Sequence, residues 1–312
     1  MRNKIIYALI IFGLLVVLAV LLTLSTARKP DSGGRKIRVV TTLFPLYDFA
    51  RNIGRDKAEV SLLLPPGVEP HSFEPKPSNV VTINEADVFI YTGKFMEPWA
   101  ENIIKGLSNK NLIVVDASRG TKMVPGVFRD QDEPAGSLDP HIWLDFDNAG
   151  VMVRNIAQAM EEKDPADKSF FQQNAEGYDR RLTELDSEFR ASLSNCQDRE
   201  IVYAGHYAFG YMTRRYGLKY MAAQGVSPDA EPTANDLVAL IEQVKKDNLK
   251  YIFYEELTSP KIAETIANET HTQMLLLNAA HNVSKAQFDE GVSFLDILKT
   301  DLANLKTGLE CK

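Results

Sequence analysis

The chain has few of the residues that build compact metal or redox motifs. Its 312 residues include only two cysteines, Cys196 and Cys311, and five histidines. The two cysteines lie too far apart in sequence for a zinc finger or a Cys-x-x-Cys motif. The sequence also contains no H-E-x-x-H segment and no adjacent pair of nucleophile and base. A zinc-dependent hydrolase, built from three histidines and a glutamate such as Glu255, is therefore only a minor alternative.

Basic residues are fewer than acidic residues in this chain. The chain carries 35 lysines and arginines against 42 aspartates and glutamates, which gives a formal net charge of −7. Domains that bind nucleic acids are usually basic, so this balance excludes nucleic acid as the expected partner. The hydrophobic share of 45% and the charged share of 25% are those of a globular protein. The length suffices for one large domain or two ordinary ones.

The N-terminus departs from this average composition. Residues 5–24 are apolar apart from Gly13 and Thr23, and they follow the basic residues Arg2 and Lys4. A run of this length is typical of an export signal and is also long enough to span a bilayer. We predict that residues 1–27 are a signal peptide or an N-terminal membrane anchor and that residues 28–36 are a linker. The protein is then extracytoplasmic, in a periplasm or on the outer face of the cell membrane, either free or anchored by residues 5–24.

The leader contains no cysteine. Attachment through a lipid-modified cysteine is therefore not available there. Retention would have to come from the uncleaved leader itself.

Strand-like and helical segments alternate in both halves of the remaining chain. In the first half, strands are expected at residues 37–42, 58–64, 87–91 and 111–115, and helices at 45–53, 77–85 and 97–107. After a loop at 118–139 and two helices, strands are expected at 201–204, 219–222, 251–254 and 273–277, and a final helix at 294–309. Strands separated by helices of this length indicate parallel sheets that are covered on both faces.

A long amphipathic helix separates the two halves. Asp164 and Pro165 form a typical helix start, and apolar residues recur at helical spacing from Tyr178 to Leu193. We predict an α/β fold of two lobes, each with a parallel sheet flanked by helices. The N-terminal lobe would span residues 37–163, the rigid connecting helix 164–195 and the C-terminal lobe 196–312.

The two cysteines are candidates for a disulfide. In an exported chain, an even number of cysteines favours a bond between Cys196 and Cys311. Such a bond would tie the C-terminus to the start of the second lobe and contribute roughly 2–4 kcal/mol. Two free thiols are the alternative.

Four of the five histidines follow strand-like runs. His71, His141, His206 and His281 are 70, 65 and 75 residues apart in sequence. Ligands of open parallel sheets bind beyond the carboxyl ends of the strands, so two histidines from each lobe could meet in the cleft between the lobes. Neutral imidazole is a good ligand for zinc. The alternative is four unrelated histidines on the surface or in the core.

A closed shell of four ligands favours binding over catalysis. A catalytic zinc normally keeps one coordination position open for water. Nearby acidic residues are candidate hydrogen-bond partners of the ligating rings. Glu255 and Glu256 end a strand and could face the cleft, whereas Glu69 and Glu74, which flank His71, could be partners of the site or ordinary loop acids.

Four segments of the chain resemble segments of one known family. They are GVEPHSFEP at residues 67–75, LDPHIWLD at 138–145, AGHYAFG at 204–210 and GVSPDAEPT at 225–233. They are similar to the solute-binding proteins that feed bacterial zinc and manganese ABC importers, and the resemblance runs in order from about residue 37 to 309. It implies two lobes joined by a rigid helix, with Zn²⁺ held between them as the transported ligand. It further implies a membrane permease with its ATPase as partners. We expect a monomer without catalytic activity.

The resemblance also bears on the choice of metal. Zinc-type members usually carry histidine at the position of His206, where many manganese-type members carry glutamate. The position of His281 is commonly acidic or replaced by water, and a fourth nitrogen there would favour zinc further. The long histidine-rich loop of some zinc-type members is absent, since residues 126–137 are short and acidic. High-affinity zinc binding is therefore expected, with a manganese- or iron-binding homologue as the alternative.

Overall fold

The computed structural model describes residues 35–126, 136–226, 228 and 232–312. The predicted leader at residues 1–27 and nearly all of the linker at 28–36 lie outside the described residues. The same holds for parts of the loop at 118–139 and of the segment at 225–233. Within the described ranges, none of the helices combines the length and the apolar character that crossing a bilayer requires.

The first four strands form a parallel sheet with the order β2-β1-β3-β4. The strands are β1 (Ile37–Thr41), β2 (Ala58–Leu62), β3 (Val88–Tyr91) and β4 (Ile113–Asp116). Helices α2 (Phe44–Gly54), α3 (Pro77–Glu85) and α4 (Ala100–Gly106) connect them. The central strands β1 and β3 are almost wholly buried, because helices cover both faces of a parallel sheet. The four predicted strands are confirmed to within two residues at each end.

The second sheet repeats this topology with the order β6-β5-β7-β8. Its strands are β5 (Glu200–Ala204), β6 (Lys219–Ala222), β7 (Tyr251–Tyr254) and β8 (Gln273–Leu276). The helices of this half are α7 (Gly210–Tyr216), α8 (Ala234–Asp247), α9 (Lys261–Thr270), α10 (Lys285–Asp289) and α11 (Phe294–Gly308). The predicted class of two α/β lobes is therefore confirmed.

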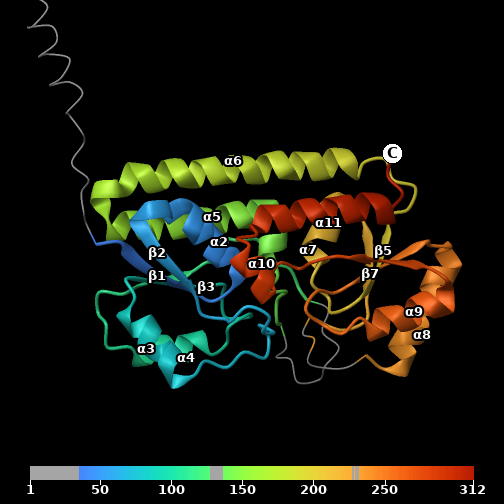
Figure 1. Cartoon of the computed structure of the whole chain (residues 1–312), viewed down its shortest axis with the longest axis horizontal. Coiled ribbons are helices and arrows are strands. Elements are labelled where there is room, and N and C mark those ends of the chain that lie inside the picture. The colour runs from blue at the N-terminus through green and yellow to red at the C-terminus, as the bar shows by residue number, and fades with distance from the viewer. Residues whose placement is uncertain (1–34, 127–135, 227, 229–231) are drawn as a thin grey trace, which may run out of the picture. The chain divides into compact units, whose positions relative to one another are not determined.

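Two helices lie between the sheets in sequence, α5 (Phe146–Lys163) and α6 (Lys168–Ser192). The predicted start at Asp164 and Pro165 opens a short 3-10 turn, in which the Asp164 carboxylate accepts the backbone N–H of Ala166 at 3.2 Å. Helix α6 begins directly after this turn. Its buried face recurs every three or four residues, and it packs on α2, α5 and α11. Figure 1 shows α6 running alongside both lobes.

The last helix, α11, packs on elements of the first half as well as on its own lobe. It contacts α2 and α6 in addition to β7 and β8. The buried carboxylate of Asp48 in α2 accepts hydrogen bonds from the Tyr178 hydroxyl of α6 at 2.8 Å and from the Phe294 N–H of α11 at 3.3 Å. The disulfide between Cys196 and Cys311 joins the end of α6 to the end of α11.

The core has one large cluster and two satellites. The large cluster takes residues from both sheets and from α2, α5, α6 and α11, while the satellites lie under α3 and α4 on one lobe and under α8 and α9 on the other. Residues 36–312 accordingly form one compact unit. The boundaries predicted at 163/164 and 195/196 stay a prediction.

Candidate metal centre

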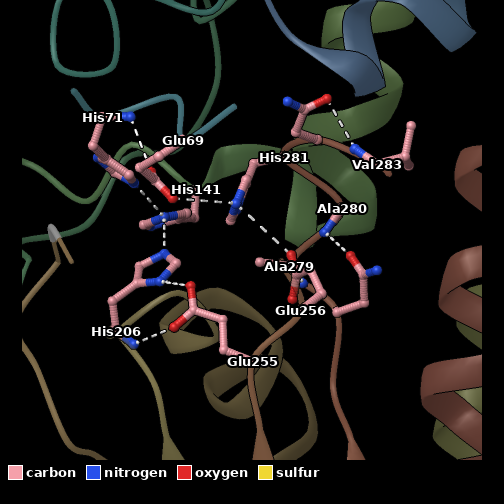
Figure 2. A network of polar contacts seen from close by, with 12 residues as sticks. Glu69, His71, His141, His206, Glu255, Glu256, Ala279, Ala280, His281 and Val283 are labelled. Atoms are coloured by element: carbon pink, nitrogen blue, oxygen red, sulfur yellow. Dashed lines mark hydrogen bonds and ion pairs between the residues drawn. The ribbon is translucent and has the colours of Figure 1, made fainter. Parts of the chain in front are cut away.

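The four histidines singled out by the sequence lie in four loops that follow strands. His71 lies beyond β2, after a turn in which Gly67 takes a φ of +84°, a value that favours glycine. His141 follows β4, His206 follows β5 and His281 follows β8. Because the strands within each sheet are parallel, these loops gather at the carboxyl edges, and Figure 2 shows the four rings turned toward one another.

Three of the rings present their Nε2 atoms to one another. The Nε2 atom of His141 is 3.3 Å from that of His71 and 3.1 Å from that of His206. Four nitrogens bound to zinc at about 2.0–2.1 Å in a tetrahedron would be roughly 3.3 Å apart. The spacing thus matches one shared metal ion, with ligands from both lobes.

The ring of His281 closes the fourth side of this group. Its centroid lies 5.5 Å from that of His206 and 6.4 Å from that of His71. Its ligand atom also groups with carboxylate oxygens of Glu69 and Glu255, all within 4.8 Å of one another. The site therefore offers a set of three histidines beside a mixed set of one histidine and two carboxylates.

Two of the rings are held by buried carboxylates. The Nδ1 atom of His206 is 2.5 Å from Glu255 Oε1, and the backbone N–H of His206 donates to Glu255 Oε2 at 3.0 Å. The Nδ1 atom of His141 is 2.8 Å from Asp139 Oδ1, which also accepts the backbone N–H of His141 at 3.0 Å. A carboxylate that accepts the Nδ1 proton leaves Nε2 free to coordinate a metal.

These contacts agree with the interpretation of Glu255 as a partner of a ligating ring. They also add Asp139, to which the sequence analysis assigns no role. Glu255 lies where it was expected, in direct contact with a candidate ligand. The signal for Asp139 was local, because an aspartate two residues before a histidine can fold back onto both the backbone and the ring.

The remaining acidic residues divide between the site and its surroundings. The Nε2 atom of His281 is 3.8 Å from Glu256 Oε1 and 4.0 Å from Glu69 Oε2, which is too long for a hydrogen bond. Glu256 Oε1 instead accepts the backbone N–H of Ala279 at 3.0 Å. Glu69 accepts the backbone N–H of His71 at 3.0 Å, whereas Glu74 is exposed.

The electrostatics keep most of the rings neutral. Burial, and then the neighbouring histidines, hold the pKa values of His71, His141 and His281 well below the usual value. Burial acts in the same direction on His206, but the Glu255 carboxylate outweighs it and raises the pKa of His206. Burial raises the pKa of Asp139 to about 7. Neutral imidazole is the form that binds a metal.

Packing around the site leaves little freedom to the chain. A Cβ atom at Gly205 would collide with Glu255 and with the Tyr203 ring, so only glycine fits between β5 and His206. The Trp143 indole donates to the carbonyl of Ala279 at 2.7 Å and stands edge-on to His141. The Trp143 ring therefore packs against one of the candidate ligands.

Comparison with known proteins places this geometry in a family. Residues 39–308 match the family described as zinc-uptake complex component A, periplasmic. The high-affinity zinc uptake system protein ZnuA of Bacillus subtilis is 35% identical over 295 residues, which cover 92% of each chain. The zinc-binding protein AdcA of Streptococcus pyogenes is 32% identical over 287 residues, 87% of this chain and 56% of that protein.

A solved structure shares the fold. The crystal structure of the Zn(II)-bound ZnuA-like domain of Streptococcus pneumoniae AdcA superposes with a TM-score of 0.76 at 32% identity, covering 88% of this chain and 100% of that domain. The family match over residues 39–308 spans both lobes and all four histidine loops. The chain therefore belongs to the family of zinc-uptake complex component A, the periplasmic component.

Proposed function

We propose that the protein captures Zn²⁺ outside the cytoplasm with high affinity and delivers it to an ABC importer in the membrane. The observation that carries this proposal is the convergence of three Nε2 atoms, from loops of both lobes, at 3.1 and 3.3 Å. Family membership and the zinc-bound relative support the choice of ion. In this proposal His71, His141 and His206 bind the ion through Nε2, and His281 is the fourth ligand.

The ligand set fits cargo binding better than catalysis. A metal with four protein ligands has no open position for a substrate or for an activated water. His141, His206 and His281 are buried, as are Glu255 and Glu256. The proposal is therefore a monomeric carrier without enzymatic activity, in which Zn²⁺ is the transported ligand and the permease is the macromolecular partner.

Manganese or iron is the second candidate cargo, and one observation favours it. Glu69 and Glu255 bring carboxylate oxygens within 4.8 Å of the ligand atom of His281, and oxygen ligands suit harder cations. If only one or two imidazoles bound the ion, these oxygens would complete the shell. The three clustered Nε2 atoms make zinc the preferred ion.

The location outside the cytoplasm rests on the leader. The family is described as periplasmic, and the related AdcA of Streptococcus pneumoniae is described as a zinc-binding lipoprotein. This chain has no cysteine before Cys196. We propose that residues 1–27 direct export and that, if they are retained, residues 5–24 hold the protein at the membrane.

Metal analysis of the purified chain tests the proposed function. Protein purified without chelator is expected to contain about one zinc per chain, and calorimetry of the metal-free protein should give a dissociation constant below about 1 μM. Competition at equal free concentrations of zinc and manganese should favour zinc. A chain that binds no zinc in calorimetry would refute the proposal, and a preference for manganese would transfer it to the second candidate.

A further inference from the structure

The four candidate ligands are held in two different ways. The rings of His141 and His206 form the carboxylate-held pair, because Asp139 and Glu255 contact their Nδ1 atoms. The rings of His71 and His281 form the loop-held pair. The Nδ1 atom of His281 is buried without a partner, and His71 has no carboxylate at Nδ1 among the described residues. The position of this second pair therefore depends on the backbone of its loops.

One side chain joins the two loops of this pair. Asn282, which directly follows His281, is fully buried. Its amide nitrogen donates to the carbonyl of Pro65 at 2.9 Å and to the carbonyl of Val68 at 2.7 Å. These carbonyls belong to the turn immediately before Glu69 and His71. The amide oxygen of Asn282 accepts the N–H of Val283 at 2.9 Å, so donors and acceptor are all used.

Backbone contacts reinforce the same junction. The N–H of Gly67 donates to the carbonyl of Val283 at 2.8 Å, and the N–H of Phe44 donates to the carbonyl of His281 at 3.3 Å. The loop after β8 is thus attached to the loop after β2 and to the start of α2. These elements come from opposite lobes, and Asn282 supplies two of the bonds between them with one buried group.

We propose that Asn282 is a positioning residue for the metal site. It holds the His71 loop and the His281 loop as one unit and thereby sets how fast the bound ion is released. This inference rests on the proposed function. Asn282 positions the loop-held pair by joining its two loops, as Asp139 and Glu255 position the rings of His141 and His206 by direct contact. An alanine in its place would remove both side-chain bonds between the loops, leaving the Pro65 carbonyl only its bond from the Val68 N–H, and would free the loops to separate.

Rates of zinc release distinguish this role from a general effect on stability. In Asn282→Ala, zinc transfer to an excess of chelator, followed by stopped flow, should be faster by at least about tenfold. Asn282→Asp keeps the volume but sets a carboxylate against two carbonyl oxygens, so it should also release zinc faster despite its added charge. Circular dichroism and the melting temperature of the metal-free protein report whether each variant folds.

Asn109 offers a matched control. Its amide also donates to two backbone carbonyls, those of Asn84 and Ala86, both at 3.0 Å, but it precedes β4 and lies at the opposite edge of the sheet from the histidines. Asn109→Ala should lower the melting temperature and leave the release rate within about twofold of wild type.

The outcomes separate this inference from the proposed function. Wild-type zinc binding with an unchanged release rate in both Asn282 variants would overturn the positioning role alone. Equal acceleration in Asn109→Ala would also overturn it. A wild-type chain that binds no zinc would overturn both.

Discussion

The carboxylate-held and loop-held pairs of histidines illustrate two ways of building one ligand set. In the first pair, a side chain next to the ring fixes its direction, so the positioning device lies within hydrogen-bond reach of each ligand. In the second pair, the direction follows from how two loops of different lobes are joined. In the first arrangement each ring keeps its direction as long as its own carboxylate stays in place, whereas in the second the positions of the rings depend on the junction between the lobes.

The comparison predicts that loss of a carboxylate-held ligand has the largest effect. His206→Ala removes one nitrogen and leaves the buried Glu255 carboxylate without its partner at 2.5 Å. Zinc affinity should fall by more than the roughly 10–100-fold loss expected for an outer partner. His71→Ala should cost less, because Glu69 lies beside the vacated position and can offer an oxygen.

Competition with a chelator of known affinity measures both variants. An equal loss of zinc affinity in His71→Ala and His206→Ala would contradict the difference proposed between the two pairs. The zinc affinity of the wild-type protein under the same conditions provides the reference.

The next effect concerns the carboxylates themselves. Asp139→Asn replaces the carboxyl group that contacts the Nδ1 atom of His141 and should weaken zinc binding by about 10–100-fold. Glu256→Gln is the matched control, because Glu256 is equally buried but lies 3.8 Å from His281 and hydrogen-bonds to Ala279 instead. It should weaken binding by less than about tenfold. Calorimetry on both variants checks the difference, and equal losses would mean that any buried carboxyl group near the site affects zinc affinity, whether or not it orients a ring.

Much of this site could be predicted from sequence because it follows from topology. Each histidine comes after a strand of a parallel sheet, and parallel strands bring their carboxyl ends to one edge. The position of Glu255 was predictable for the same reason, since it directly follows β7, the strand beside β5 and His206. The disulfide followed from the even number of cysteines and the expected export.

Other features depend on contacts that no local pattern encodes. Asn282 lies 217 residues from Pro65, and its bonds exist only once both lobes have folded. Glu256 looked equivalent to its neighbour Glu255, but successive residues point in opposite directions at a strand end, and the Ala279 backbone takes its oxygen. The docking of α11 on α2 through Asp48 likewise depends on tertiary packing.

The pH dependence gives the smallest and most specific prediction. His71, His141 and His281 have lowered pKa values and stay neutral near neutral pH, so protons do not compete with zinc there. Glu255 raises the pKa of His206, so His206 is the ring whose proton zinc must displace first. Affinity should therefore be highest above this raised pKa and fall by about tenfold for each pH unit below it.

Calorimetry in buffers of different ionisation enthalpy should show a release of protons per zinc that increases as the pH falls through that pKa. Glu255→Gln removes the charge that favours the imidazolium, so in this variant the fall in affinity should begin at a lower pH, even though the absolute affinity is weaker. A wild-type affinity that stays flat from about pH 7.5 to about pH 5.5 would contradict the assignment of His206. A fall that is unchanged in Glu255→Gln would instead assign the displaced proton to another ring, and the carboxylate-held pair would then differ from the loop-held pair in geometry alone.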